Sequence, residues 1–136
     1  MNYFLAKTEP RDYSIDDLAS EKSTVWDGIK NPQALAALRA MQPGDRVLVY
    51  HSGATAGITG VAEVAGAPRP DPKDAKLSVV DLSYLMHLEP PTPRAEIKAS
   101  GMFDDWALVR QGRLSSMKVP REFVEWLRKR YPGVHI

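Results

Sequence analysis

Residues 25–34 read VWDGIKNPQA and bring together side chains that could hold a flat, polar ring such as a nucleobase. Trp26 offers a face on which a ring can stack, and Lys30 offers a cation for a phosphate. Asn31 and Gln33 each carry a hydrogen-bond donor and an acceptor for the polar edge of such a ring. The same residue types also fit a structural role, in which Trp26 is a core residue and Asn31 caps a helix. Taken alone, the segment favours the structural role.

Residue types for metal or cofactor chemistry are sparse in this chain. It has no cysteine, and its three histidines stand far apart at positions 51, 87 and 135, without the spacing of a zinc-binding motif. The glycines between Gly53 and Gly60 lack the lysine of a phosphate-binding P-loop. We therefore expect neither a metal nor a cofactor.

No pattern in the sequence predicts a catalytic group. Adjacent carboxylates, as in Asp16-Asp17, point in different directions in regular structure and do not form a natural acid–base pair. Ser52 follows His51 in a predicted strand, where neighbouring side chains face opposite sides of the sheet, so that their adjacency does not activate the serine. The chemistry that the residue types offer is therefore binding rather than catalysis.

The composition, with 43% hydrophobic and 26% charged residues in 136, is that of one ordinary globular domain. No apolar run approaches the roughly 20 residues of a membrane-spanning helix, so we expect a cytoplasmic protein that does not bind membranes. The formal net charge of +1 does not by itself indicate a nucleic-acid-binding protein. Residues 107–131 are locally basic, although the cations at 128–130 stand where a final helix would end and where its dipole favours them.

The pattern of β-branched and apolar residues predicts strands in the first two-thirds of the chain. Residues 3–8 form a short strand that Glu9-Pro10 ends, because proline cannot donate to a sheet ladder. The next two strands, residues 46–51 and 58–64, are predicted to be a hairpin or near neighbours. Residues 66–74 are predicted to be a surface loop, and residues 76–88 a long strand closed by Glu89-Pro90-Pro91.

Short helices are predicted between and after these strands. Ser14 and Asp17 form a variant of the capping box before a helix that extends to about Ala19. Asn31-Pro32 starts a second helix that ends near Gln42. Further helices are expected over residues 95–99 and 121–129, residues 114–117 are expected to be extended, and residues 106–110 are ambiguous. The whole pattern predicts an α+β domain built on a curved mixed sheet or small β-barrel, flanked by short α-helices.

Four segments resemble a known family in their order and spacing. They are Lys7-Thr8-Glu9-Pro10 with Tyr13-Ser14 and Asp17-Leu18; Trp26-Asp27-Gly28 with Asn31 and Gln33-Ala34; Pro43-Gly44-Asp45 with Tyr50-His51-Ser52 and residues 57–64; and residues 108–111 with Arg113-Leu114-Ser115. From about residue 2 to residue 127 the chain resembles the EVE domain family, which has the PUA-like fold. This resemblance implies one EVE domain over residues 1–136. It also implies a non-enzymatic reader of a modified base in DNA or RNA, because EVE domains are similar to YTH and SRA domains.

The resemblance also implies where the base would bind. The implied binding residues are Lys7, Thr8, Glu9, Trp26, Asn31, His51 and Ser52, with Arg113 and Ser115 near the mouth of the pocket. Lys30 and Gln33 join them from the segment described first. The chain departs from the family at residues 30–36, which read KNPQALA where the family commonly has an aromatic ring, an arginine fork and a second amide. A lysine cannot reproduce the two-point geometry of an arginine.

Two other functions stay open on the sequence. The first is an enzyme acting on RNA or modified nucleotides, as in other PUA-like proteins, with Glu9 or Lys7 as the acid or base. The second is a protein-interaction module in which the basic C-terminal helix, with Arg128 and Lys129, meets an acidic partner. The modification, the choice between DNA and RNA, and the oligomeric state do not follow from the sequence.

Overall fold

A computed structural model describes all residues from Met1 to Ile136, and its centre is three buried strands. They are β1 (Tyr3–Thr8), β3 (Arg46–His51) and β4 (Gly57–Val64). β1 and β3 run parallel, so that Lys7 pairs with Tyr50 and Thr8 with His51, while β3 and β4 form an antiparallel pair. The carboxyl ends of β1 and β3 therefore lie side by side.

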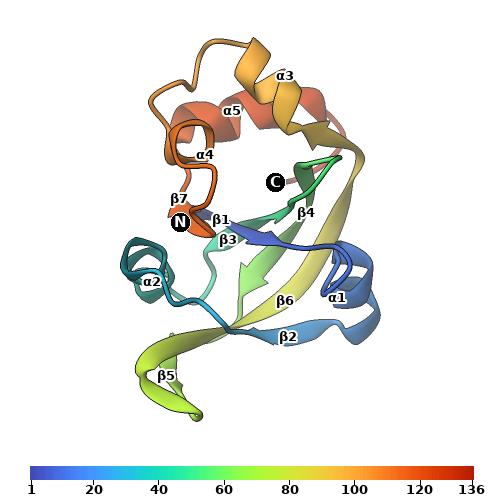
Figure 1. Cartoon of the computed structure of the whole chain (residues 1–136). Helices are drawn as coiled ribbons and strands as arrows, with labels where there is room; N and C mark the ends of the chain where they lie inside the picture. The colour runs from blue at the N-terminus through green and yellow to red at the C-terminus, as the bar shows by residue number, and fades with distance from the viewer.

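Four further strands extend this centre into a curved sheet with open edges (Figure 1). They are β2 (Ser23–Trp26), β5 (Arg69–Asp71), β6 (Asp74–Pro93) and β7 (Ser116–Lys118). The strand order is β2-β6-β4-β3-β1-β7, with β5 paired to β6 beside this path. β2 and β7 do not pair with each other, so that the predicted curved mixed sheet is confirmed while the barrel is not closed.

Five short helices cover the sheet. They are α1 (Ile15–Glu21), α2 (Pro32–Arg39), α3 (Arg94–Ala99), α4 (Ala107–Arg110) and α5 (Arg121–Arg130). Figure 1 shows α3, α4 and α5 gathered over one end of the sheet, with α1 and α2 on its two sides. Every helix contributes to one connected hydrophobic core, in which Leu18 of α1, Leu38 of α2 and Leu127 of α5 are fully buried. None of the helices combines the length and the apolar character needed to span a membrane.

Local capping signals predicted the starts of α1 and α2 correctly. The Ser14 hydroxyl accepts a hydrogen bond from the Asp17 backbone N–H at 3.1 Å, and the Asp17 carboxylate accepts one from the Ser14 N–H at 2.9 Å. The Asn31 side-chain oxygen accepts from the N–H groups of Gln33 and Ala34, at 2.8 and 3.1 Å. The end of α2 was placed too late, because the helix stops at Arg39 rather than near Gln42.

Three strand assignments need correction. Residues 69–71 of the expected surface loop are β5, which pairs with β6. Pro90 and Pro91 do not end β6, which continues to Pro93, because the pairing with β4 is irregular between His87 and Thr92 and needs no N–H from those prolines. β2, which ends at Trp26, was not predicted as a strand and pairs with residues 80–83 of β6. The expectations of a single domain and of a cytoplasmic location stay predictions.

Candidate functional site

A pocket of about 390 Å³ opens between the end of β1 and the segment that leads from β2 to α2. It is lined by Lys7, Thr8, Tyr13, Thr24, Val25, Trp26, Asp27, Gly28, Ile29 and Ser115. We call it the β1–β2 pocket. Its volume lies within the usual range for small-molecule sites, and its lining combines apolar and aromatic side chains with a few polar groups.

Two aromatic rings meet in the β1–β2 pocket. Trp26 is only 8% exposed and belongs to the hydrophobic core, so it has the structural role and also lines the pocket. The edge of one ring faces the other, since the centroids of Tyr13 and Trp26 lie 6.1 Å apart with an interplanar angle of 85°. The backbone of Trp26 is fixed by its pairing with Val80 of β6. Tyr13 was part of a quoted motif but was not predicted to be a site residue.

Hydrogen bonds hold Tyr13 at the wall of the pocket. The Thr8 hydroxyl donates to the Tyr13 backbone oxygen at 2.7 Å, and the Tyr13 hydroxyl donates to the Glu21 carboxylate. Burial and the hydrogen bond with Glu21 raise the pKa of Tyr13 above its ordinary value. The phenol therefore stays protonated at neutral pH.

The polar groups of the pocket supply both donors and an acceptor. The Lys7 ammonium donates to the Gly112 backbone oxygen at 2.9 Å and lies 5.4 Å from the centroid of the Tyr50 ring. Burial, and then the nearby charge of Arg94, lower the pKa of Lys7 below its ordinary value. Ser115 and Asp27 also line the pocket, and neither side chain forms a hydrogen bond with the rest of the chain. Of the eleven predicted residues, Lys7, Thr8, Trp26 and Ser115 line this pocket.

Seven of the predicted residues lie outside the β1–β2 pocket. They are Glu9, Lys30, Asn31, Gln33, His51, Ser52 and Arg113. Ser52 fastens the ends of β1 and β3, since its N–H donates to the Thr8 carbonyl and its hydroxyl to the Glu9 carboxylate, both at 3.0 Å. The side-chain oxygen of Asn31 is occupied by the cap of α2. Gln33 lines a different cavity between α2 and β7, and Lys30 and Arg113 are exposed.

Of the six lining residues that were missed, all but Thr24 lie within the segments that the sequence singled out. All six residues from 24 to 29 line the pocket, because β2 and its continuation form one wall. Asp27 and Gly28 belong to the Trp26-Asp27-Gly28 motif, but a sequence motif does not show which of its residues face a cavity. The alternation of a strand gives no signal for them, because consecutive residues of β2 line the pocket.

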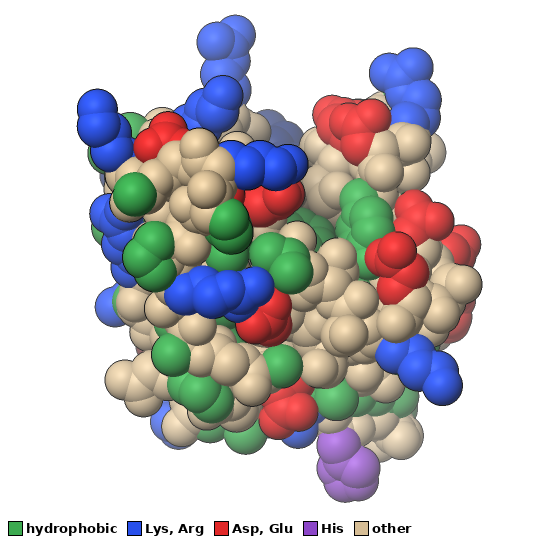
Figure 2. All heavy atoms as spheres, turned by 90° about the horizontal axis from the view of Figure 1, so that it is seen from below, with side chains coloured by type: hydrophobic (Ala, Val, Ile, Leu, Met, Phe, Trp, Pro, Cys, Tyr) green, Lys and Arg blue, Asp and Glu red, His purple; other side chains and the backbone are tan.

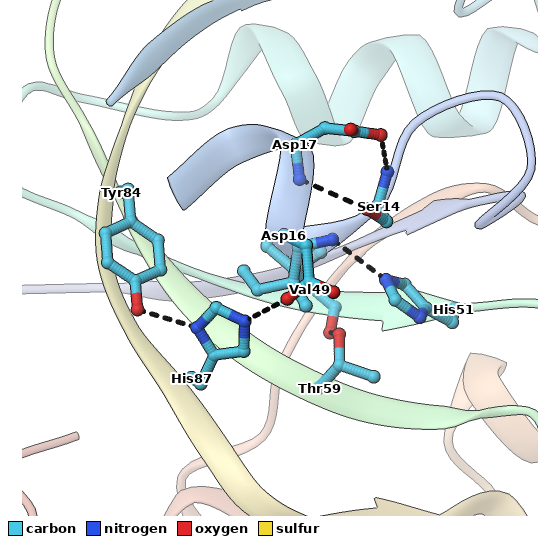
Figure 3. Close-up of polar contacts among 9 residues, drawn as sticks. Ser14, Asp16, Asp17, Val49, His51, Thr59, Tyr84 and His87 are labelled. Carbon is cyan, nitrogen blue, oxygen red and sulfur yellow. Dashed lines mark hydrogen bonds and ion pairs between the residues drawn. The ribbon is translucent and has the colours of Figure 1, made fainter. Parts of the chain in front are cut away.

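Two histidines dock α1, the helix that follows Tyr13, onto the sheet (Figure 3). The His51 Nε2 atom accepts from the Ile15 backbone N–H at 3.0 Å. The His87 ring contacts the Asp16 carboxylate at 2.6 Å and the Tyr84 hydroxyl at 2.7 Å. Burial lowers the pKa of His51, while Asp16 opposes this shift and His87 adds to it. No group of His, Asp and Glu in the structure is arranged to hold a metal ion.

The basic end of α5 is largely engaged within the chain. Arg128 donates to the Tyr3 hydroxyl at 2.8 Å and to the Ile136 carbonyl at 3.2 Å. Arg130 forms an ion pair with Glu96 and lies over the Trp126 ring, 5.3 Å from its centroid. These arginines are therefore not free for an acidic partner.

Comparisons with known proteins found one matching family model, together with similar proteins and similar solved structures. The model of the EVE domain matches residues 2–130. The structure of Rpa0253 from Rhodopseudomonas palustris is 32% identical, with a TM-score of 0.91 over 100% of this chain and 97% of that chain. Thymocyte nuclear protein 1 of Homo sapiens is 27% identical over 171 residues, which cover 97% of this chain and 76% of that protein.

A further structure, of human THYN1 protein in complex with 5-methylcytosine-containing DNA, has the same fold. Its TM-score is 0.88, and the match covers 99% of this chain and 100% of that chain at 23% identity.

Proposed function

The chain belongs to the EVE domain family, and from this we propose that it is a non-enzymatic module that reads a modified base in DNA. The base would occupy the β1–β2 pocket with its plane against the Tyr13 ring, because the Tyr13 and Trp26 rings meet at 85° and one plane cannot lie flat on both. The observation that carries the proposal is this pocket, in which an aromatic wall, a cation and an unpaired carboxylate meet. The THYN1 complex with 5-methylcytosine-containing DNA supports DNA as the nucleic acid and a modified cytosine as the base.

The polar groups of the pocket complement the edge of cytosine. Cytosine carries an amino donor at N4, which a carboxylate can accept, and Asp27 supplies that acceptor. The remaining polar atoms of the cytosine edge are acceptors, and Lys7 and Ser115 supply donors. Val25 and Ile29 give apolar surface for a methyl group. A base inside a duplex cannot reach such a pocket, so the nucleotide would be flipped out of the stack at a cost of a few kcal/mol.

The surface charge fits recognition through a pocket. Figure 2 shows one face of the molecule, on which basic and acidic side chains are interspersed. A protein with a net charge of +1 gains little non-specific affinity from phosphates. Stacking and edge contacts would therefore supply most of the discrimination between modified and unmodified DNA.

Of the groups named for the two alternative functions, only Lys7 lines the pocket, where burial and the charge of Arg94 lower its pKa. The Glu9 carboxylate accepts a hydrogen bond from Ser52 and does not line the pocket, so it is not placed to act as an acid or base there. At the basic end of α5, Arg128 and Arg130 are engaged with Tyr3, Glu96 and Trp126, which leaves only Lys129 unpaired there.

The contribution of Asp27 tests the proposal. Asp27→Ala removes the acceptor for the N4 amino group, and a hydrogen bond to a charged group is worth about 1.5–3 kcal/mol. We expect the affinity for a duplex with one 5-methylcytosine to fall about 10- to 150-fold, as measured by fluorescence anisotropy. Asp12→Ala is the matched control, because Asp12 is an exposed acid outside the pocket. An equal effect of the two substitutions, or equal affinity of the wild-type protein for methylated and unmethylated duplexes, would reject the proposal.

A further inference from the structure

The largest cavity of the protein, about 810 Å³, lies between the β3–β4 loop on one side and the end of β6 with α3 on the other. We call it the α3 cleft. It is lined by His51, Gly53, Ala54, Thr55, Ala56, Thr59, Pro91, Pro93, Arg94, Ala95 and Lys98. Arg94 and Lys98 are the only charged members apart from the titratable His51, and no Asp or Glu lines the cleft. The site proposed for the base does not use these residues.

The two cations of the α3 cleft are not neutralised within the chain. Neither the Arg94 nor the Lys98 side chain forms an ion pair or a hydrogen bond, although three other arginines pair with carboxylates. Arg94 also lies close enough to Lys7 for its charge to lower the pKa of that lysine. Like charges gathered without a carboxylate disfavour one another, so an anion between them would be stabilised.

The α3 cleft adjoins the β1–β2 pocket. Thr8 lines the pocket and His51 lines the cleft, and these two residues are neighbours in the parallel pair of β1 and β3. Adjacent strands lie only about 4.8 Å apart. Arg94 faces the cleft while its charge acts on Lys7, which lines the pocket. Basic side chains therefore line both the pocket and the cleft beside it.

The backbone of the cleft wall is held by a hydrogen bond and carries mostly small side chains. The Arg94 N–H donates to the Ala56 carbonyl at 2.9 Å, which ties the β3–β4 loop to the start of α3. At Gly57 a Cβ atom would lie 2.5 Å from the Thr92 carbonyl oxygen, so the close approach of β4 to β6 beside the cleft requires glycine. Residues 53–56 carry small side chains, which leave room in the cleft for a large ligand such as a nucleic-acid strand.

We propose that the α3 cleft is the path of the DNA strand whose modified base enters the β1–β2 pocket, and that Arg94 and Lys98 bind its phosphates. This inference rests on the proposed function and adds the residues that contact the DNA backbone. Phosphate contacts position a nucleic acid without reading its sequence. The cleft thus sets the register of the strand, while the pocket identifies the base.

The salt dependence of DNA binding tests whether the cleft binds phosphates while the pocket recognises the base. Each phosphate contact contributes about 0.9 to the slope of log K against log[salt] for B-DNA and about 0.7 for a single strand. For the double variant Arg94→Gln, Lys98→Gln we expect the magnitude of the slope for a 5-methylcytosine duplex to fall by about 1.4 to 1.8 between 50 and 200 mM salt. The ratio of affinities for methylated and unmethylated duplexes should remain that of the wild type.

The matched control is the double variant Lys73→Gln, Lys129→Gln, which removes the same charge from exposed positions outside the cleft. Arg94→Lys with wild-type Lys98 retains both charges and should retain the slope. If the cleft variant and the control have the same slope of log K against log[salt], the DNA strand does not run through the cleft. A methylation preference that persists in that case would leave the proposed base reading intact. If the methylation preference is absent but the cleft variant still loses slope, the proposed base reading fails while the phosphate path stands.

Discussion

At the scale of single residues, Asp27 and Ser115 are unpaired polar groups of the β1–β2 pocket, whereas Trp26 is almost wholly committed to the core. Replacement of a buried aromatic residue by alanine costs about 3–5 kcal/mol. That is a large share of the 5–15 kcal/mol by which domains are stable. A loss of binding in Trp26→Ala would therefore report unfolding as much as a lost stack.

Tyr13 gives a cleaner test of stacking, because its ring is more exposed than that of Trp26 and faces the same pocket. Removal of an aromatic ring on which a base stacks costs about 1–3 kcal/mol. We expect Tyr13→Leu to weaken binding of the 5-methylcytosine duplex about 5- to 150-fold, as measured by anisotropy on protein shown to be folded by circular dichroism. Tyr13→Phe, which keeps the ring and loses the hydroxyl, should retain most of the affinity. Wild-type affinity in Tyr13→Leu would exclude this ring as the stacking surface.

The sequence predicted part of the pocket at this scale. Lys7, Thr8, Trp26 and Ser115 could be found because they belong to ordered motifs. Tyr13 belongs to the same motif as Lys7 and Thr8 but was not chosen, because its place in the wall depends on contacts with Trp26, thirteen positions along the chain, and with Thr8.

At the scale of elements, the parts that followed local rules were predictable and the parts that depended on distant partners were not. The caps at Ser14 and Asn31 depend on residues two or three positions away, and both starts were predicted. β5 is a strand only because β6 lies beside it. The passage of β6 beyond Pro90 likewise depends on its irregular pairing with β4.

The docking of α1 has a pH dependence that resides in His51. In the folded protein burial lowers the pKa of His51, and its Nε2 atom accepts from the Ile15 N–H. The unfolded chain takes up a proton at the ordinary pKa of about 6.5, above the pKa of the folded state. The free energy of unfolding therefore falls as the pH is lowered through this interval, because the unfolded state binds more protons.

We expect wild-type protein to lose more stability than His51→Gln between pH 7.5 and pH 5.5, as measured by urea denaturation. Glutamine can still accept a hydrogen bond but cannot titrate in this range. Asp16 and His87, which also act on His51, are retained in both proteins, so that the difference between the two profiles reports His51. Identical pH profiles would show that this histidine does not couple protonation to folding.

At the scale of the whole molecule, β6 connects the regions that the two proposals use. Its residue Val80 pairs with Trp26 at the β1–β2 pocket, and its residues Pro91 and Pro93 line the α3 cleft. Between these points β6 pairs with β4 in the centre of the sheet. A ligand that bridges pocket and cleft would therefore contact β6 directly at Pro91 and Pro93 and would contact β2, which pairs with β6, at the pocket. Its binding energy would oppose unfolding of the whole sheet.

Ligand binding should therefore raise the unfolding temperature of the whole protein in one transition. A ligand present at 100 times its dissociation constant adds about 2.7 kcal/mol to the free energy of unfolding. For a protein of this length we expect the Tm to rise by about 10 °C, as measured by calorimetry with a 5-methylcytosine duplex at that concentration. The unmethylated duplex at the same concentration should give a smaller shift, because it would keep the phosphate contacts and lose the fit of the methyl group. Equal shifts with the two duplexes would mean that the pocket does not distinguish the methylated base from the unmethylated one, which would contradict the proposed reading of the modification.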